Sequence, residues 1–391
     1  MKKISPFFSF AFVAVLCLTP FLSCRWRSGS KASEAVAGKD LSPAKSRIKY
    51  AHGFTIDYYD RYKEVKILNR AGDKMDTLDY LLLPAGASVP PGHPHAQVIN
   101  IPVKSLIVMA SLHIAQADFA GVADRITGLG TGQYVNSPVV REGLRTGRTR
   151  QVGIDANLNN ELVIAMHPGV VMTMSNPDAA FGQYRTLMDA GVPVVPNAEW
   201  LETTPLGRAE WVKLIGALTD REEWVNRKFD SVAQLYQQLA GTGGGAAVKP
   251  SVIIGMPFKG TWYTPAGESY MAQFLRDAGA GYHWSNSKGT GSLPLSFESV
   301  APEALTADFW LNVGYVDSKK DILAKDTRYG SFHAFRTGAV YNNNNRTNDL
   351  GSNDYWESGA VNPQLVLADL IRILHPGLLP ADSLVYYKQL K

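Results

Sequence analysis

The sequence predicts an α/β protein in which two similar lobes are joined by one long helix. From Val103 onward, short apolar runs alternate with helical segments, which is the pattern of parallel strands covered by helices. A second series of the same kind begins at 251–257. Between the two series, apolar residues recur at helical spacing over 220–240. We therefore expect two Rossmann-like βα lobes, one on each side of the long helix in the sequence.

The composition is that of a globular protein long enough for two hydrophobic cores. The chain has 391 residues, of which 45% are hydrophobic and 19% charged, and its formal net charge is +4. The 35 glycines and 22 prolines are close to average usage, and only two cysteines are present. These numbers exclude a disordered chain, a collagen and a disulfide scaffold.

The first 23 residues have the features of a secretory signal peptide. Lys2 and Lys3 supply the positive charge, and an apolar run follows over 7–22. The run is short for a membrane span, and it ends at Cys24 in a segment that resembles a bacterial lipobox. We expect an exported, periplasm-facing protein that is anchored to a bacterial membrane by a lipidated Cys24. The alternative is a plain signal peptide with an incidental cysteine.

Removal of the expected signal peptide lowers the net charge of the chain. Loss of Lys2 and Lys3 lowers the basic residues from 39 to 37, against 35 acidic ones. The mature chain is then nearly neutral, and we expect no nucleic acid partner.

The rest of the chain divides by composition into five parts. Residues 24–45 are small and polar and predict a tether, and 46–102 predict a β-rich, antiparallel N-terminal extension. The N-terminal lobe is expected over 103–219 and the C-terminal lobe over 242–391. The interlobe helix is expected over 220–241.

The expected bounds of the interlobe helix depend on two local patterns. Asp220 followed by Glu223 has the spacing of a capping box at its start. The glycine-rich run 241–247 predicts a hinge or turn after its end.

Motifs that would identify an enzyme are missing from the sequence. It has no G-x-S-x-G, Walker or H-E-x-x-H motif, and the glycines of 128–132 have the wrong spacing for a dinucleotide loop. The histidines are scattered, and only His113 directly follows an expected strand. We therefore expect neither catalysis nor a protein-made metal site.

One glutamate recurs at an equivalent place in each half of the chain. Glu161 and Glu298 each begin a short helix that leads into a strand. A carboxylate in the first helical turn is favoured by the helix dipole whatever its function, so the pattern alone does not define a site.

Four segments and the long helix together resemble the substrate-binding proteins of ABC importers for ferric siderophores, haem and cobalamin. The resemblance runs from about Val103 to Leu374. It implies a class III periplasmic binding protein, with a ligand cleft between the lobes. It also implies that Glu161 and Glu298 dock on arginines of the permease. The segments are VGIDANLNNELVIAMHPGVVMTM, AEWLETTPLGRAEWVKLIGAL, FKGTWYTPAGESYMAQFLRDAGAGYHW and LSFESVAPEALTADFWLN.

In such a fold, segments that end strands and face the cleft supply an aromatic-rich set of candidate ligand contacts. Aromatic rings of this kind suit stacking on a macrocycle or a catecholate, although each is as compatible with core packing. Arg208 and Arg346 are further candidates, which could neutralise an anionic chelate. The candidate contacts are His113, Tyr134, Asn176, Trp200, Trp262, Tyr263, Tyr315 and Tyr341.

The resemblance implies a monomeric binding lipoprotein without turnover. It would capture a ferric siderophore, haem or corrinoid and deliver it to an ABC permease dimer with its ATPase, and it would carry no covalent cofactor apart from the N-terminal lipid. Two alternatives remain open: a chelatase or other tetrapyrrole- or metal-handling enzyme on the same fold, and a structural surface lipoprotein.

Overall fold

A computed structural model describes residues 45–71, 74–154, 157–174 and 181–391. All of them belong to one compact unit, Ala37–Lys391. The expected signal peptide, most of the expected tether and the lipidation site Cys24 lie outside the described residues, as does the candidate contact Asn176. These remain predictions.

The N-terminal lobe is built on a five-stranded sheet in the order β7-β6-β5-β8-β9, with every neighbouring pair parallel. The central strand β5 is buried along its whole length, because helices cover both faces of a parallel sheet of this kind. The strands are β5 (Leu106–Val108), β6 (Ile126–Leu129), β7 (Arg150–Gln151), β8 (Val170–Met174) and β9 (Val194–Asn197).

The helices of this lobe follow the alternation that the sequence predicts. Thr204 caps α5 by accepting the N–H of Gly207, and proline stands at the first position of that helix. The helices are α1 (Ser111–Ala120), α2 (Pro138–Thr146), α3 (Asn160–Ala165), α4 (Arg185–Asp189), α5 (Pro205–Glu210) and α6 (Val212–Thr219).

The C-terminal lobe repeats this plan with the sheet order β13-β10-β15-β16-β17, in which only β17 is antiparallel. A three-stranded antiparallel sheet, β11-β12-β14, is added to it. The strands are β10 (Ser251–Ile254), β11 (Pro257–Phe258), β12 (Thr261–Pro265), β13 (Gly281–Tyr282), β14 (Ser292–Leu295), β15 (Phe309–Leu311), β16 (Val340–Asn342) and β17 (Lys388–Gln389). The helices are α8 (Tyr270–Asp277), α9 (Phe297–Ala304), α10 (Lys319–Lys325), α11 (His333–Thr337) and α12 (Pro363–Leu374).

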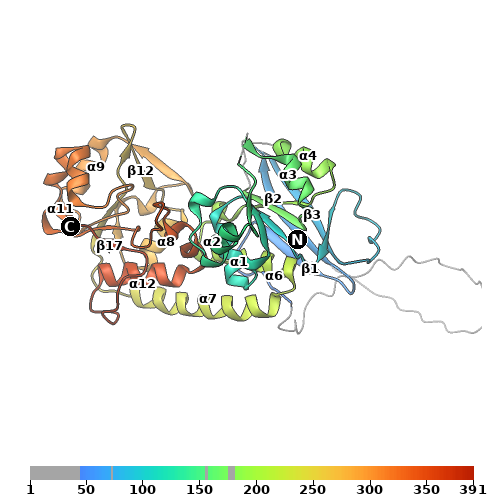
Figure 1. Cartoon of the computed structure of the whole chain (residues 1–391). Coiled ribbons are helices and arrows are strands. Elements are labelled where there is room, and N and C mark those ends of the chain that lie inside the picture. Colours follow the sequence, from blue (N-terminus) through green and yellow to red (C-terminus); the bar gives the residue numbers. More distant parts are fainter. Residues whose placement is uncertain (1–44, 72–73, 155–156, 175–180) are drawn as a thin grey trace, which may run out of the picture. The chain divides into compact units, whose positions relative to one another are not determined.

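The long helix α7 (Glu222–Gly244) connects the two lobes (Figure 1). It packs against α6 of the first lobe and against α8 and α12 of the second. Its 23 residues extend about 34 Å at 1.5 Å per residue. The predicted apolar face is buried as expected, and its main residues are Val225, Phe229, Val232, Tyr236 and Leu239.

Both ends of α7 differ from the prediction. Asp220 is the left-handed C-cap of α6 and forms an ion pair with Lys63, so it does not open a capping box. The glycines at the other end continue the helix instead of making a hinge. A Cβ on Gly243 would lie 2.4 Å from the carbonyl oxygen of Asp277, so glycine is needed there to let α7 approach α8 closely.

The N-terminal extension forms a four-stranded sheet in the order β1-β2-β3-β4. The prediction of an antiparallel sheet holds for the first three strands but is wrong for the last, since β4 runs parallel to β3. The loop over 85–96 is long enough to return the chain to the same end of the sheet. The strands are β1 (Phe54–Tyr58), β2 (Lys63–Ala71), β3 (Lys74–Pro84) and β4 (Gln97–Ile101).

The extension packs on the N-terminal lobe through polar contacts as well as apolar ones. The hydroxyl of Tyr80 donates to the carbonyl oxygen of Val194, 2.9 Å away, and the N–H of Val194 donates to Oε1 of Gln97. Val194 is the first residue of the edge strand β9. The extension thus satisfies backbone groups that an open sheet edge would leave unpaired.

A buried ion pair fastens the first described residues to the same lobe. The carboxylate of Glu210 accepts the backbone N–H groups of Lys49, Tyr50 and Ala51. It also pairs with the ammonium of Lys213 at 2.8 Å. The segment that emerges from the expected tether is therefore held by hydrogen bonds to a carboxylate whose charge is compensated.

Candidate functional site

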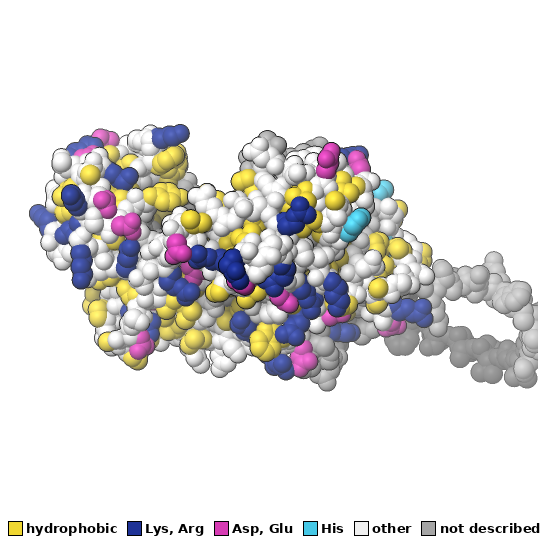
Figure 2. All heavy atoms as spheres, in the orientation of Figure 1, with side chains coloured by type: hydrophobic (Ala, Val, Ile, Leu, Met, Phe, Trp, Pro, Cys, Tyr) yellow, Lys and Arg dark blue, Asp and Glu magenta, His cyan; other side chains and the backbone are white. Residues whose placement is uncertain are grey.

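Several predicted contact residues follow the carboxyl ends of parallel strands, where open α/β sheets bind ligands. Figure 2 shows a hollow in the molecular surface between the two lobes. Tyr134 follows β6, Trp200 follows β9 and Tyr315 follows β15. Tyr315 is fully exposed, and Tyr134 and Trp200 are also among the exposed large side chains. Such rings are accessible to a ligand, as the prediction requires.

The predicted ligand contact Trp262 is wrong because the side chain belongs to the core. Trp262 is fully buried, packs near Trp310 and Phe332, and donates its indole N–H to the carbonyl oxygen of Ile254 at 2.8 Å. Side chains alternate between the two faces along β12, so its neighbour Tyr263 is the exposed one.

His113 and Tyr341 also differ from accessible cleft residues. His113 is fully buried in α1, and burial lowers its pKa to about 4, so the ring is neutral at physiological pH. It is a core residue of the N-terminal lobe and not a ligand contact. Tyr341 is half-buried in β16, where its ring lies 6.3 Å from that of Phe309.

A pocket lies where helices of the two lobes meet. About 370 Å³ of space lies between its lining atoms, and this figure includes open solvent at the mouth of the pocket. One wall comes from α5 of the N-terminal lobe, and the other walls come from α8, α12 and the segment before α12. The lining residues are Pro205, Arg208, Tyr270, Phe274, Tyr355, Trp356, Gly359, Ala360, Pro363 and Val366.

Arg208 supplies the cation of this pocket. Its Nε donates to Glu199 at 2.6 Å, and its guanidinium lies 4.2 Å from the centre of the Tyr270 ring. Burial by itself would lower the pKa of Arg208, but the neighbouring Glu199 raises it above the ordinary value. Arg208 therefore stays charged, and much of its charge is already compensated.

Tyr355 and Trp356 form an aromatic wall of the pocket, on the C-terminal lobe side. Tyr355 is buried, whereas 55% of Trp356 is exposed. Their rings meet edge to face, with centroids 4.9 Å apart. The two residues lie in a 3-10 turn, η8 (Asp354–Trp356), which is followed by another, η9 (Ser358–Val361).

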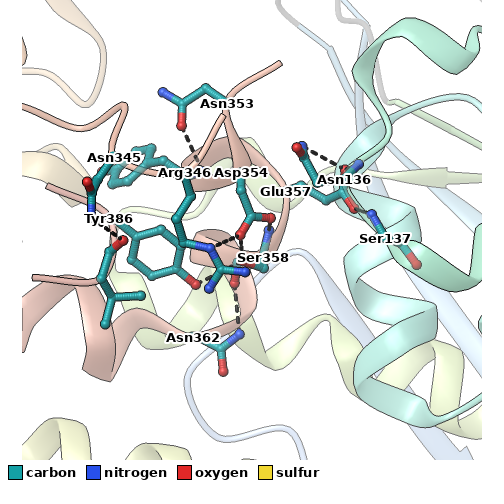
Figure 3. A network of polar contacts seen from close by, with 12 residues as sticks. Asn136, Ser137, Asn345, Arg346, Asn353, Asp354, Glu357, Ser358, Asn362 and Tyr386 are labelled. Atoms are coloured by element: carbon teal, nitrogen blue, oxygen red, sulfur yellow. Dashed lines mark hydrogen bonds and ion pairs between the residues drawn. The ribbon is translucent and has the colours of Figure 1, made fainter. Parts of the chain in front are cut away.

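A polar network fixes this aromatic segment to the body of the C-terminal lobe (Figure 3). Asp354 is buried and pairs with Arg346 at 2.9 Å, and it also accepts the hydroxyl hydrogen of Ser358 at 2.6 Å. Ser358 in turn lies 2.9 Å from the hydroxyl of Tyr386. Arg346, a candidate for anion binding, is thus engaged in holding the pocket wall.

Glu357, between the two turns, contacts the other lobe. Its carboxylate accepts the backbone N–H groups of Asn136 and Ser137, each at 2.8 Å, and both residues directly precede α2 of the N-terminal lobe (Figure 3). Glu357 is 2% exposed. Burial raises its pKa to about 7, although the two backbone hydrogen bonds oppose that shift.

Sequence reasoning missed the most important residues of this pocket, namely Tyr270, Tyr355, Trp356 and Glu357. The signal that could have found the last three is the run YWE, which stands between turn residues shortly before the Asn-Pro that opens α12. Tyr355 of this run packs in the core, whereas the exposed Trp356 is not explained by core packing. Tyr270 gives no such signal, because it occupies an ordinary helical position.

Glu161 and Glu298 have the local geometry that the sequence predicts. Each lies in the first turn of a short helix, α3 or α9, and is exposed. Asn159 caps α3 and Ser296 caps α9 through their side-chain oxygens. Hydrogen bonds from its own backbone N–H and from Ser296 lower the pKa of Glu298, so this carboxylate is charged at neutral pH.

Two kinds of feature are absent from the described part of the chain. No group of three or more histidine, cysteine, aspartate or glutamate side chains is arranged to hold a metal ion there. No helix in that part is both long enough and apolar enough to cross a membrane.

Comparison with known proteins finds relatives along most of the chain. It is 26% identical over 360 residues to an uncharacterised lipoprotein of Methanocaldococcus jannaschii, and the match covers 84% of this chain and 82% of that protein. A second uncharacterised lipoprotein of the same organism is 23% identical over 358 residues, covering 88% and 87%. No family model matches the chain.

Solved structures of the same fold come from binding proteins of bacteria. The haem-binding protein HutB of Vibrio cholerae matches with a TM-score of 0.53 at 16% identity, covering 68% of this chain and 99% of that one. The siderophore-binding protein FeuA of Bacillus subtilis, complexed with ferri-bacillibactin, matches with a TM-score of 0.52 at 15% identity, covering 70% and 94%. A possible iron-binding periplasmic protein of Staphylococcus epidermidis matches with a TM-score of 0.52 at 18% identity, covering 70% and 99%. The chain therefore has the class III periplasmic solute-binding fold that its sequence resemblance predicts.

Proposed function

We propose that the protein is an exported solute-binding lipoprotein that delivers a chelate or macrocycle to an ABC importer. The observation that carries this proposal is a pocket whose walls come from both lobes and include four aromatic side chains and one guanidinium. Support for export and anchoring comes from the signal-like N-terminus and from the archaeal relatives, which are named lipoproteins.

The pocket chemistry favours a ligand that is flat or aromatic and carries negative charge. Tyr270 and Trp356 offer ring faces and edges, and Arg208 offers a charge that Glu199 only partly offsets. Ferric catecholate siderophores and haem have both properties. The pocket opens to solvent, so most of a large chelate would lie outside it while one ring-bearing arm contacts the lining residues.

Ligand binding can be tested by quenching of tryptophan fluorescence with haemin, ferri-bacillibactin and cyanocobalamin as probes. Trp356→Ala removes an aromatic wall, and we expect about tenfold weaker binding of the probe that binds the wild type, or ~1.4 kcal/mol. Trp224→Ala is a matched control, because Trp224 is also half-exposed but lies on α7. Equal affinities in the two variants, or no binding of any probe by the wild type, would contradict the proposal.

Permease docking is a separate part of the proposal. Two exposed, charged glutamates at capped helix starts, one in each lobe, could pair with permease arginines and set the register of the complex. Glu161→Ala combined with Glu298→Ala should abolish uptake of the bound probe while its affinity in solution is kept. Glu223→Ala, an exposed glutamate on α7, serves as the control. Normal uptake by the double variant would remove both residues from the docking surface.

We further propose that the protein binds without turnover. Incubation with excess haemin or ferri-bacillibactin should leave the chelates intact after one ligand has bound per chain. Multiple turnover of metal insertion or removal would favour the chelatase alternative instead.

A further inference from the structure

The two lobes are joined outside the long helix by a buried carboxylate. The two oxygens of Glu357 accept one backbone hydrogen bond each, Oε1 from Ser137 and Oε2 from Asn136 (Figure 3). The side-chain amide of Asn136 adds a longer contact to Oε2 at 3.3 Å. We call this set of contacts, between Glu357 and the pair Asn136 and Ser137, the interlobe latch.

Burial of the Glu357 carboxylate costs free energy, which argues that the contact is not incidental. Glu357 is 2% exposed, and within the described chain no lysine, arginine or histidine forms an ion pair with it. Its charge is offset only by backbone and side-chain N–H groups of the other lobe. A buried carboxylate without a cation is tolerated only while such hydrogen bonds are complete. The position of Glu357 therefore depends on the presence of the N-terminal lobe.

The latch is directly continuous with the pocket. Glu357 follows Tyr355 and Trp356 in the chain and precedes Gly359, and all three of these neighbours line the pocket. The ion pair of Asp354 with Arg346 anchors the start of this segment to the C-terminal lobe. The same short segment is thus attached to both lobes, and the aromatic wall lies between Asp354 and Glu357.

We propose that Glu357 is a positioning residue that fastens the aromatic wall of the pocket to the N-terminal lobe, so that ligand binding and lobe contact stabilise each other. This inference rests on the proposed function. The reciprocity follows from linkage: if the latched state binds ligand more tightly, bound ligand must favour the latched state by the same factor.

The latch can be broken from either lobe. Glu357→Gln keeps the size of the side chain but replaces one acceptor oxygen with an NH₂ group, which leaves a backbone N–H without a partner. Ser137→Pro removes one donating N–H directly, and the φ of −54° at Ser137 suits proline. Ser137→Ala is the matched control, since it removes the same hydroxyl and keeps the N–H.

Hydrogen exchange of the full-length chain, measured by mass spectrometry without ligand, reads the latch directly. In Glu357→Gln and Ser137→Pro, we expect peptides covering 132–140 and 350–361 to exchange about tenfold faster or more than in the wild type. Peptides covering β5 and β10 should not change, and Ser137→Ala should resemble the wild type. Unchanged exchange at 350–361 in Ser137→Pro would overturn the inference, and that variant decides the question even where Glu357→Gln does not fold.

Haemin and ferri-bacillibactin then test the link to binding. The probe that binds the wild type should slow exchange at 132–140 as well as at 350–361, and both variants should bind it more weakly than Ser137→Ala does. Equal affinity in all three proteins would overturn the coupling. If the wild type binds neither probe, the proposed function fails, whereas the exchange of the ligand-free variants still decides whether Glu357 fastens the pocket wall.

Discussion

Two buried glutamates, Glu210 and Glu357, hold distant segments in place in similar ways but in different electrostatic surroundings. Both accept backbone N–H groups from residues far away in the chain. Glu210 lies within the N-terminal half and has Lys213 as a buried counter-ion. Glu357 lies between the lobes, and no cation of the described chain pairs with it.

The difference shows how each contact is suited to its place. A carboxylate that is paired with a buried cation in the same lobe has its charge compensated whatever the other lobe does, and it suits a fixed attachment for the N-terminal segment. An uncompensated carboxylate between lobes is held only by hydrogen bonds from its partner, and burial raises its pKa to about 7. The first arrangement suits a fixed joint, whereas the second suits a contact that can be released.

The largest effect is expected from Glu210→Ala. The change removes the counter-ion of the buried Lys213, which keeps only the carbonyl oxygen of Arg47 as an acceptor, and it removes the acceptor of three backbone N–H groups. We expect a loss of about 3–5 kcal/mol in the free energy of unfolding, measured with urea, together with faster proteolysis near 45–53. A loss below about 1 kcal/mol would show that the N-terminal segment is held mainly by its apolar contacts.

Lys213→Met should make Glu210 resemble Glu357, because Glu210 then becomes a buried carboxylate without a counter-ion. Methionine fills much of the lysine volume but leaves Glu210 with backbone donors alone. We expect a loss of about 2–3 kcal/mol in the free energy of unfolding, because the buried carboxylate loses its counter-ion. Urea titrations of the variant and the wild type measure this loss. A loss below about 1 kcal/mol would mean that the backbone donors alone compensate the carboxylate.

The next largest effect is expected from the titration of Glu357, which makes the free energy of unfolding depend on pH. Its folded pKa, about 7, lies above the value of 4.5 for a free glutamate, so the folded protein binds more protons between these pH values. Its contribution to stability should therefore fall as pH rises from 4.5 to 7, by up to about 1.4 kcal/mol for each pH unit.

The contribution of Glu357 is isolated by the difference in the free energy of unfolding between the wild type and Glu357→Gln, measured with urea at each pH. Nearby Asp118 and Asp354 and the cations Arg346 and Lys228 are present in both proteins, so their titration largely cancels. The stability advantage of the wild type should be larger at pH 5 than at pH 7.5. An advantage that does not change, or that grows with pH, would contradict the raised pKa.

The smallest effect is expected at the rim of the same interface. Arg141 and Asp349 form an exposed ion pair between the lobes, with 86% of the aspartate side chain in solvent. Asp349→Asn should cost less than about 1 kcal/mol in the free energy of unfolding and leave exchange at 350–361 unchanged. A larger loss of stability, or faster exchange at 350–361, would show that this ion pair also contributes to the interlobe latch.

Much of the fold was predictable because its signals are local. The strand β5 and the long helix α7 follow from apolar runs and helical spacing in their own residues. The wrong details are those that depend on neighbours. Asp220 could not be identified as a C-cap without Lys63, and Gly243 could not be placed inside a helix without the close approach of Asp277.

The candidate site was less predictable for the same reason. The exposed Tyr315 and the buried Trp262 both belong to aromatic-rich segments near strand ends, and only the packing of the lobe separates them. Trp262 faces the core because of the register of β12 with β14, which the sequence of β12 does not contain. The predicted position of Glu298 in the first turn of a short helix is confirmed, and Ser296 caps that helix.

The sequence by itself determined the class of fold, the long helix and the two first-turn glutamates, because hydrophobic period and helix caps act over a few residues. Only the tertiary structure decided which aromatic side chains line the pocket and that Glu357 joins the lobes. Glu357 and Asn136 are 221 positions apart, and their contact exists because the packing of the two lobes brings a carboxylate and two backbone N–H groups together away from water.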